Sequence, residues 1–347
     1  MAQPAFDQAA ADTIRALSSY SKPSLWKSCF QLLNTFVPFV LLWALMWLSL
    51  SYSYWVTLLL AIPTSLFVVR LFIIQHDCGH GSFFRSRRAN NTVGFFLGVL
   101  TLIPYDYWRK SHAIHHASHG DLERRGWGDI DTRTVKEYLA LSPGRRRLYR
   151  ILRSPVALLV IGPVYQFLIK HRLPLDAPRE WKREWKSVHL TNLGFALVLL
   201  VMWATIGLGA FVQIQLPVFL LSGSIGIWLF YVQHQFEGAY WEQTENWSFH
   251  SAAMLGSSYY DLPPILHWLT GNIGVHHIHH LCCHIPNYNL QRCMKENPEL
   301  QDVPRLTLWT SLRCLRLKLW DEDQHKLVSF SEIRQTRLGA PTAASHR

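Results

Sequence analysis

Three groups of closely spaced histidines are the residues of this chain best suited to do chemistry. They are His76 with His80, His112 with His115 and His116, and His276 with His279 and His280. Residues three or four apart lie on one face of a helix, so the imidazoles of each group can turn toward one point. Without metal, such imidazoles would repel one another if protonated or lack hydrogen-bond partners if buried and neutral. We therefore expect them to bind metal, because neutral imidazole is a preferred ligand of iron, zinc and copper.

The number of imidazoles indicates two metal ions. A structural zinc site is closed by four ligands and a catalytic one by three plus water, so eight imidazoles exceed one site. A pair of ions suits iron working on oxygen, whereas zinc cannot change oxidation state, and zinc in the expressed protein would be an artefact of expression. The carboxylate-rich di-iron class needs two Glu-x-x-His pairs, and only Glu322 with His325 matches.

The other histidines and the other motifs give weaker indications of chemistry. His277 is predicted to point away from the third group and to be a spare residue, not a ligand. Dinucleotide-binding, Walker and nucleophile-elbow motifs are missing from the sequence. No flavin or nicotinamide site is therefore expected, and electrons must come from another protein. Ordinary surface or core roles are expected for His171, His189, His250, His325 and His346.

Two long segments without charge indicate the elements that position these groups. No Asp, Glu, Lys or Arg lies between Lys27 and Arg70 or between Lys186 and Glu237. Each gap is long enough for two membrane-spanning helices of about 20 residues joined by a tight turn. The alternative, a buried helical hairpin in a soluble protein, is disfavoured by the length of these runs. The predicted spans are residues 30–52, 55–75, 190–210 and 218–233, with turns near residues 51–54 and 213–217.

The positive charge of the chain, +11 at pH 7, indicates its orientation. Both predicted turns lack Lys and Arg, whereas the segment between the hairpins is rich in them. Short loops kept in the cytoplasm carry this excess, so the termini and the middle segment are expected on the cytoplasmic side, against anionic lipid headgroups. Four spans account for the basic balance, and nucleic-acid binding is therefore not expected.

The remaining segments are expected to form one domain, residues 1–347, with the spans. Its cytoplasmic parts are an N-terminal segment of residues 1–28 with a short amphipathic helix near 9–19, a cap of residues 76–189 and 234–330, and a mobile tail of 331–347. Residues 92–105 and 155–169 are apolar but too short to span, which is typical of interfacial or re-entrant pieces. Residues 306–320 interleave Leu and Trp with basic residues, which favours a helix at headgroup level.

With these residues in view, the chain resembles the membrane fatty acid desaturases, especially bacterial acyl-lipid desaturases. The resemblance covers roughly residues 30 to 295. It rests on the His-Asp-Cys-Gly-His-Gly-Ser-Phe-Phe run from His76, the Ser-His-Ala-Ile-His-His-Ala run from Ser111, the run from Gly271 to Leu281, and the run from Gly223 to Glu237. It implies an all-α integral membrane fold with four transmembrane helices in two hairpins and a helical cytoplasmic cap, which carries a di-iron site above a hydrophobic acyl tunnel.

The resemblance also implies a ninth ligand at the end of the fourth span, and His234 matches that place. Related animal desaturases have an Asn one turn earlier that reaches metal through water, but this chain has Phe230 there. Asn272 is a candidate substitute. Asp77 and Asp129, and less distinctively Asp131, are candidates for accepting the second ring N–H of a ligand histidine. Trp108 and Trp241 are either tunnel residues or interfacial anchors, as tryptophans in membrane proteins often are.

These features predict an enzyme of the bacterial inner membrane that desaturates an acyl lipid with O2 as co-substrate and two external electrons. The separate electron donor would be a ferredoxin, a flavodoxin or a cytochrome b5-like protein. One alternative is a di-iron membrane hydroxylase acting on alkanes, carotenoids or sterols, because both reactions begin by removing one hydrogen. The other is a non-enzymatic membrane metal carrier, although carriers place their ligands near the bilayer midplane. The double-bond position, the carrier of the acyl chain, the donor and the oligomeric state are not encoded in these motifs.

Overall fold

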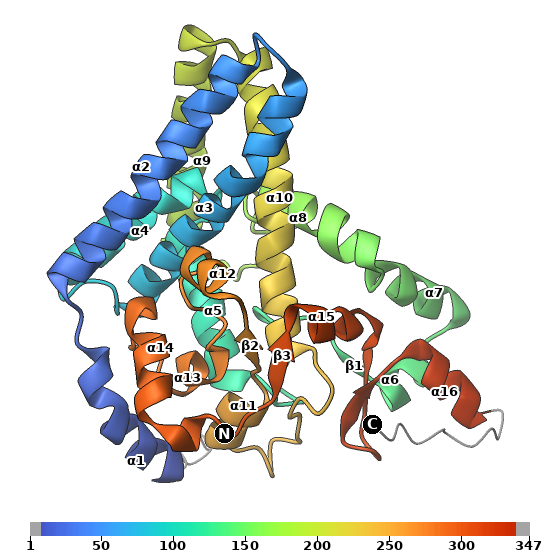
Figure 1. Cartoon of the computed structure of the whole chain (residues 1–347). Helices are drawn as coiled ribbons and strands as arrows, with labels where there is room; N and C mark the ends of the chain where they lie inside the picture. Colours follow the sequence, from blue (N-terminus) through green and yellow to red (C-terminus); the bar gives the residue numbers. More distant parts are fainter. Residues whose placement is uncertain (1–7, 338–347) are drawn as a thin grey trace.

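Four long helices lie side by side, and the shorter elements gather at one of their ends (Figure 1). The computed structural model describes residues 8–337. The long helices are α2 (Leu25–Ser49), α3 (Tyr54–His80), α9 (Lys182–Thr205) and α10 (Leu208–His234). Each is long and apolar enough to cross a membrane, which confirms the four predicted spans and the predicted helical membrane fold.

Helix α2 shows why these helices suit a bilayer. Its exposed side chains are apolar, such as Leu41 and Leu45, whereas its buried positions include Gln31 and Thr35. Lipid solvates apolar side chains, so polar ones gain by turning inward to partners. Gln31 donates to Asn287 (2.8 Å), and Thr35 accepts from the guanidinium of Arg70 (3.0 Å).

The predicted turn at residues 213–217 is wrong. The second hairpin turns at Ile206 and Gly207, and Gly207 has a φ of 81° that suits a glycine. Pro217 lies inside α10, where its missing N–H leaves the carbonyl of Gln213 without its helical partner. The hydroxyl of Tyr54 donates to that carbonyl (3.2 Å) and so makes the proline tolerable. A stretch without charge had offered no signal for the position of the turn.

The middle segment contains a bent helical arm. Its parts are α7 (Pro143–Leu152), η2 (Ala157–Ile161), α8 (Gly162–Tyr165) and η3 (Gln166–Lys170), and η2 and η3 are π-helical. The arm bends by 63° between α7 and the rest, which makes it a broken span or a re-entrant piece. Val156, Val160 and Ile169 on it are exposed apolar residues, as expected for a segment that contacts lipid.

Two small sheets complete the cap and were not predicted. One has the order β1 (Arg133–Thr134), β4 (Leu319–Asp321), β5 (Lys326–Val328); the other pairs β2 (Tyr259–Asp261) with β3 (Arg305–Thr307) in parallel. The helix expected over residues 306–320 is only partly correct: α15 (Leu308–Ser311) and η5 (Leu312–Arg316) are helical, but β3 and β4 take the two ends of that stretch. Strand pairing, which amphipathic spacing does not report, overrides the helical pattern there.

The predicted mobile tail also needs correction. Residues 330–337 form α16 (Phe330–Arg337), and residues 338–347 lie outside the described part of the chain. Phe330 packs against Tyr138 (ring centroids 5.3 Å apart), and Ile333 is buried in the same cluster. Two apolar anchors in a polar segment are enough to fix the helix on the cap.

The other cap elements surround the ends of α3 and α10. They are α1 (Gln8–Leu17), η1 (Ser18–Ser21), α4 (Arg87–Leu100), α5 (Tyr105–Ser118), α6 (Val135–Ala140), α11 (Phe249–Leu255), α12 (Pro264–Leu269), α13 (His276–Leu281), α14 (Asn287–Glu296) and η4 (Pro298–Leu300). Helix α1 lies within the predicted N-terminal segment, close to the expected 9–19.

Close packing of α4 against α5 fixes the end of α3. A Cβ on Gly94 would lie 2.2 Å from the ring of Tyr105, so only glycine fits there. The hydroxyl of Tyr105 in turn donates to the carbonyl of Cys78 (2.7 Å), between His76 and His80. The turn of α3 that bears the first histidine group is thereby held by a buried hydrogen bond.

Candidate metal centre

Four helices bring the nine predicted ligands together. His76 and His80 lie on the last turn of α3, and His234 is the last residue of α10. The other six come from α5 and α13, which are short helices of the cap: His112, His115, His116, His276, His279 and His280. Spacings of three and four place each group on one helical face, as predicted, and the faces of the four helices converge.

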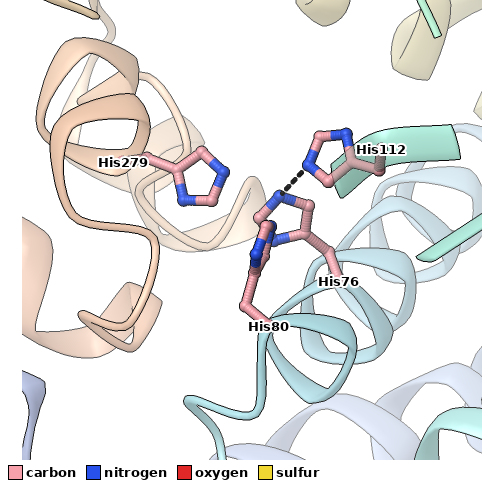
Figure 2. A group of neighbouring side chains, drawn as sticks. All are labelled: His76, His80, His112 and His279. Carbon is pink, nitrogen blue, oxygen red and sulfur yellow. Dashed lines mark hydrogen bonds between the residues drawn. The ribbon is translucent and has the colours of Figure 1, made fainter. Parts of the chain in front are cut away.

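One group of imidazoles surrounds a common point between α3, α5 and α13. His76, His80, His112 and His279 each offer a ring nitrogen, and these nitrogens all lie within 4.8 Å of one another. Figure 2 shows the four rings facing inward from three elements. The Nε2 atoms of His76 and His112 are 3.1 Å apart. His116 joins this group, because its Nε2 lies 3.1 Å from that of His112 and 3.0 Å from that of His279.

A second group lies directly beside the first. His115, His234 and His280 offer nitrogens within the same 4.8 Å limit. The Nε2 of His234 lies 3.2 Å from that of His115 and 3.0 Å from that of His276, which adds a fourth member. The ring of His280 stacks on that of His116 at 4.1 Å, so the two groups are neighbours. Five and four imidazoles around two points match a pair of metal ions.

The distances between the ring nitrogens fit metal ligation. Two nitrogens that each lie about 2.1 Å from one ion at a right angle are about 3.0 Å apart. The five Nε2 pairs above are 3.0 to 3.2 Å apart. In addition, the buried Nε2 atoms of His80 and His280 have no hydrogen-bond partner within residues 8–337. Buried polar atoms are rarely left unpaired, so a metal that accepts their lone pairs accounts for both.

The protonation of these rings suits ligation as well. Burial, together with the neighbouring imidazoles, lowers the pKa of His112, His116 and His279 well below the ordinary value of 6.5. The same causes lower the pKa of His276 and His280. The rings are therefore neutral at pH 7, which is the form that binds metal.

Carboxylates orient two of the rings. Nδ1 of His115 donates to Asp129 at 2.6 Å, and Nδ1 of His76 donates to Asp77 at 3.2 Å. Each contact leaves Nε2 free to face the centre, which is how metal-binding histidines are usually held. Asp77 itself accepts from the backbone N–H (2.7 Å) and the side-chain amide (2.8 Å) of Asn287. Asn287 begins α14, so this helix holds Asp77 in place.

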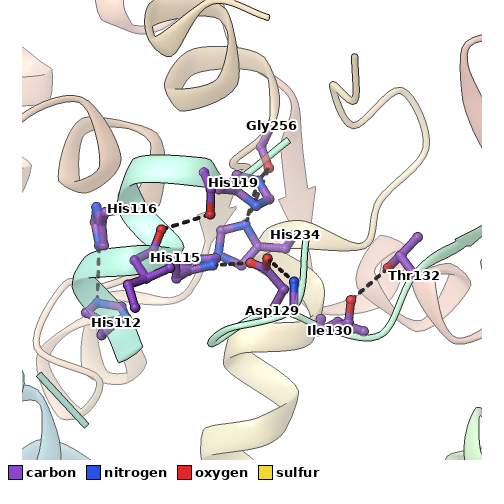
Figure 3. A network of polar contacts seen from close by, with 12 residues as sticks. His112, His115, His116, His119, Asp129, Ile130, Thr132, His234 and Gly256 are labelled. Atoms are coloured by element: carbon purple, nitrogen blue, oxygen red, sulfur yellow. Dashed lines mark hydrogen bonds and ion pairs between the residues drawn. The ribbon is translucent and has the colours of Figure 1, made fainter. Parts of the chain in front are cut away.

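His119 was missed by the sequence reasoning. It is buried, and its Nε2 donates to the carbonyl of Gly256 (2.8 Å) while lying 3.1 Å from Nδ1 of His234 (Figure 3). His119 also forms a group of possible ligand atoms with His115 and Asp129. Its spacing of four from His115 was the available signal, because it puts both rings on one face of α5. Burial and the neighbouring His115 lower its pKa to about 4.

Other residues singled out from the sequence lie around the centre. Nε2 of His277 lies 2.9 Å from the carbonyl oxygen of Leu300, so the ring turns away. Asn272 donates to the carbonyl of Asn287 (3.1 Å). Asn287 donates to Asp77, which accepts from His76, so two residues separate Asn272 from the nearest ligand histidine along this path. The ring of Phe230 lies 5.2 Å from that of His115 and forms an apolar wall.

Trp108 covers the first group rather than anchoring the protein in the interface. Its ring stacks on His112 with centroids 4.5 Å apart and meets Phe72 edge-on at 5.4 Å. A Cβ on Gly79 would lie 2.9 Å from this ring, so the glycine within the first histidine motif makes room for the tryptophan. Aromatic packing of this kind fixes a ligand ring and limits water around it.

Comparison with known proteins gives one consistent family. A sequence model described as fatty acid desaturase matches residues 51–310. The chain is 46% identical over 327 residues to a fatty acid desaturase of Bacillus subtilis, which covers 94% of this chain and 92% of that protein. It is 29% identical over 238 residues to an sn-1 acyl-lipid omega-3 desaturase (ferredoxin) of Synechocystis, covering 64% and 62%. An sn-1 oleoyl-lipid 12-desaturase of the same genus is 28% identical over 231 residues, covering 65% and 64%.

Proposed function

The chain belongs to the fatty acid desaturase family, and we propose that it inserts a double bond into the acyl chain of a membrane lipid at two iron ions. The observation that carries this proposal is the convergence of nine imidazoles whose Nε2 pairs lie 3.0 to 3.2 Å apart. His76, His80, His112, His116 and His279 would hold one ion, and His115, His234, His276 and His280 the other. When bound, the iron pair supplies O2-dependent oxidation of two adjacent methylene groups.

The protein's own residues position the reactants. Asp77 and Asp129 hold two ligand rings in the tautomer that leaves Nε2 free. The ring of Phe230 packs beside His115 and that of Phe72 packs on Trp108, so apolar rings border the ligand histidines, which would suit a saturated chain and help to exclude water. Because an unactivated methylene offers nothing to hydrogen-bond, the specificity must come from how firmly the walls fix the chain.

Electrons must be delivered by a separate protein. The sequence carries no flavin, nicotinamide or cluster-binding motif, and one relative is named as ferredoxin-dependent. We infer a one-electron donor of the ferredoxin, flavodoxin or cytochrome b5 type. The membrane would be the bacterial inner membrane, with the termini and the metal centre on the cytoplasmic side, as the distribution of Lys and Arg favours.

Expression in a host that lacks the activity tests the proposal. Fatty acids released from the host lipids are analysed by gas chromatography with mass spectrometry, which locates a new double bond. Replacement of His115 or His279 by Ala should reduce the unsaturated product to background and lower the iron content, whereas replacement of the exposed His189 should change neither. Hydroxylated fatty acids without new double bonds would instead identify the hydroxylase alternative.

A further inference from the structure

Two buried cations lie over the ring of one tyrosine, Tyr231, in the last turn of α10 before His234. Arg153 follows α7, and Lys318 precedes β4; each is only 6% exposed. The guanidinium carbon of Arg153 lies 5.5 Å from the ring centroid of Tyr231, and the ammonium of Lys318 lies 5.6 Å from it. Segments 165 positions apart in sequence thus bring two positive charges to one buried place.

Neither cation has a carboxylate partner among residues 8–337. Arg153 donates to the amide oxygen of Gln235 (2.8 Å), and its Nε is buried with no partner. The ammonium of Lys318 donates to the hydroxyl of Tyr231 at a long 3.4 Å, with no other partner for it in that part of the chain. Burying a charge without a counter-charge costs several kcal/mol, and two like charges make the cost larger.

Loss of a proton does not remove the repulsion between the two cations at neutral pH. Burial and the nearby Arg153 lower the pKa of Lys318 to about 8, so most of the lysine is still protonated at pH 7. An arginine stays charged throughout. Gln235 is already committed, because its amide nitrogen donates to Thr132 (2.9 Å). An anion that contacts both cations would pair both charges and give the buried Nε of Arg153 an acceptor.

The surroundings indicate where that anion comes from. Leu152 and Val156 beside Arg153 are exposed apolar residues, and so are Trp309 and Leu312 in the elements that lead to Lys318. Exposed apolar side chains on both sides of a basic site are typical of the level where headgroups meet acyl chains. Arginine and lysine are the residues that bind phosphate oxygens most readily.

We propose that Arg153 and Lys318 form a binding site for the phosphate group of a membrane phospholipid, with Tyr231 as its floor. The inference depends neither on the metal centre nor on the product of the reaction. It predicts that a lipid with a phosphate stabilises the protein more than a lipid with the same acyl chains and no phosphate.

Thermal unfolding of the purified protein in a phosphate-free maltoside detergent tests the site. Phosphatidylglycerol should raise the unfolding midpoint by at least roughly 3 °C, and diacylglycerol with the same chains should raise it much less. Lys318→Met removes the charge while filling the space, and it should weaken the apparent affinity for phosphatidylglycerol about tenfold. The matched control is Arg316→Gln, at an exposed position two residues away, which should keep the full shift.

Equal shifts with both lipids in the wild-type protein would overturn the proposal, and so would a full shift in Lys318→Met. Inorganic phosphate alone giving the whole shift would overturn the assignment to a lipid. Lys318→Arg keeps a charge at the site and should retain most of the response, so a folded variant remains if the methionine is not tolerated. Loss of the response in Lys318→Arg would count against a site that recognises charge.

Discussion

At the scale of single residues, three imidazoles of the centre present one ring nitrogen inward and place the other beside an acceptor. His76 has Asp77 and His115 has Asp129. His234 has no carboxylate beside it; its Nδ1 lies 3.4 Å from the carbonyl of Gly256, which also accepts from His119. The acceptors differ in charge, and they should therefore differ in how strongly they raise the basicity of the ring they hold.

Asp129→Asn tests the charged acceptor. The amide keeps the shape of the side chain but removes the negative charge opposite His115, so iron affinity should fall by about 10-fold to 100-fold. Iron per chain, measured by elemental analysis after dialysis against a graded chelator, reports the change. Asp131→Asn is the matched control, because only the backbone carbonyl of Asp131 has a recorded hydrogen bond, to Tyr149. Equal iron retention in both variants would contradict the orienting role of Asp129.

His119→Leu tests the residue that sequence reasoning missed. The leucine removes the donor to Gly256 and the ring that lies 3.1 Å from His234, so the second group of ligands should loosen and iron affinity should drop by about tenfold. His119→Gln can still donate to the carbonyl and should restore part of the binding. His277→Gln, a change at a buried histidine that faces Leu300, should leave the iron content unaltered. Normal iron binding in His119→Leu would show that this ring only fills space.

These residues also show how much of the site can be predicted from the sequence. Helical spacing is local, so it was sufficient to group eight histidines, and resemblance supplied His234. His119 directly follows the helix that bears His115, but its partner Gly256 is 137 positions away, and no local pattern reports that carbonyl. The pairing of Arg153 with Lys318 was not predicted for the same reason. Each residue alone resembles one more surface cation in a basic chain, although both are buried.

At the scale of elements, prolines and glycines determine how the helices meet. The turn of the second hairpin could not be placed from sequence, because Pro217 is typical of a turn unless another segment satisfies the carbonyl it frees, and Tyr54 from a different helix does so. The same limit applies to β3 and β4, whose partners lie far along the chain. Composition therefore predicted the existence of the helices, while contacts between elements set their ends.

Gly94→Val tests the packing of α4 on α5. The new methyl groups would meet the ring of Tyr105, displace its hydroxyl from the carbonyl of Cys78 and disturb the turn that carries His76 and His80. Overpacking of this kind costs about 1–3 kcal/mol, so both the unfolding midpoint and the iron content should fall. The control is Gly226→Val in α10, where a Cβ would meet nothing within 4 Å. A stable Gly94→Val protein with normal iron would contradict the role of this contact.

At the scale of the whole molecule, the asymmetry of the protein follows from where charge is allowed. One end of the four-helix group consists of two short turns, and the other carries the cap (Figure 1). The histidine groups and most basic residues belong to that end. Lipid-facing surfaces tolerate almost no charge, so most basic residues lie in the cap, and Arg70 within α3 is buried against Thr35. If the cap is cytoplasmic, the two turns must face the opposite side of the membrane.

Single cysteines at the two ends test this orientation. Cys29 is exposed and Cys283 is partly exposed, so both are first replaced by Ser, which leaves four buried cysteines. In that chain Ser51→Cys lies in the first turn and Asp323→Cys lies on the cap, and both positions are exposed. A membrane-impermeant maleimide added to intact spheroplasts should label Ser51→Cys, because that turn would face outward. It should label Asp323→Cys only after permeabilisation. The reverse pattern would place the cap, and with it the metal centre, outside the cytoplasm, where neither a cytoplasmic electron donor nor the positive-inside rule would fit.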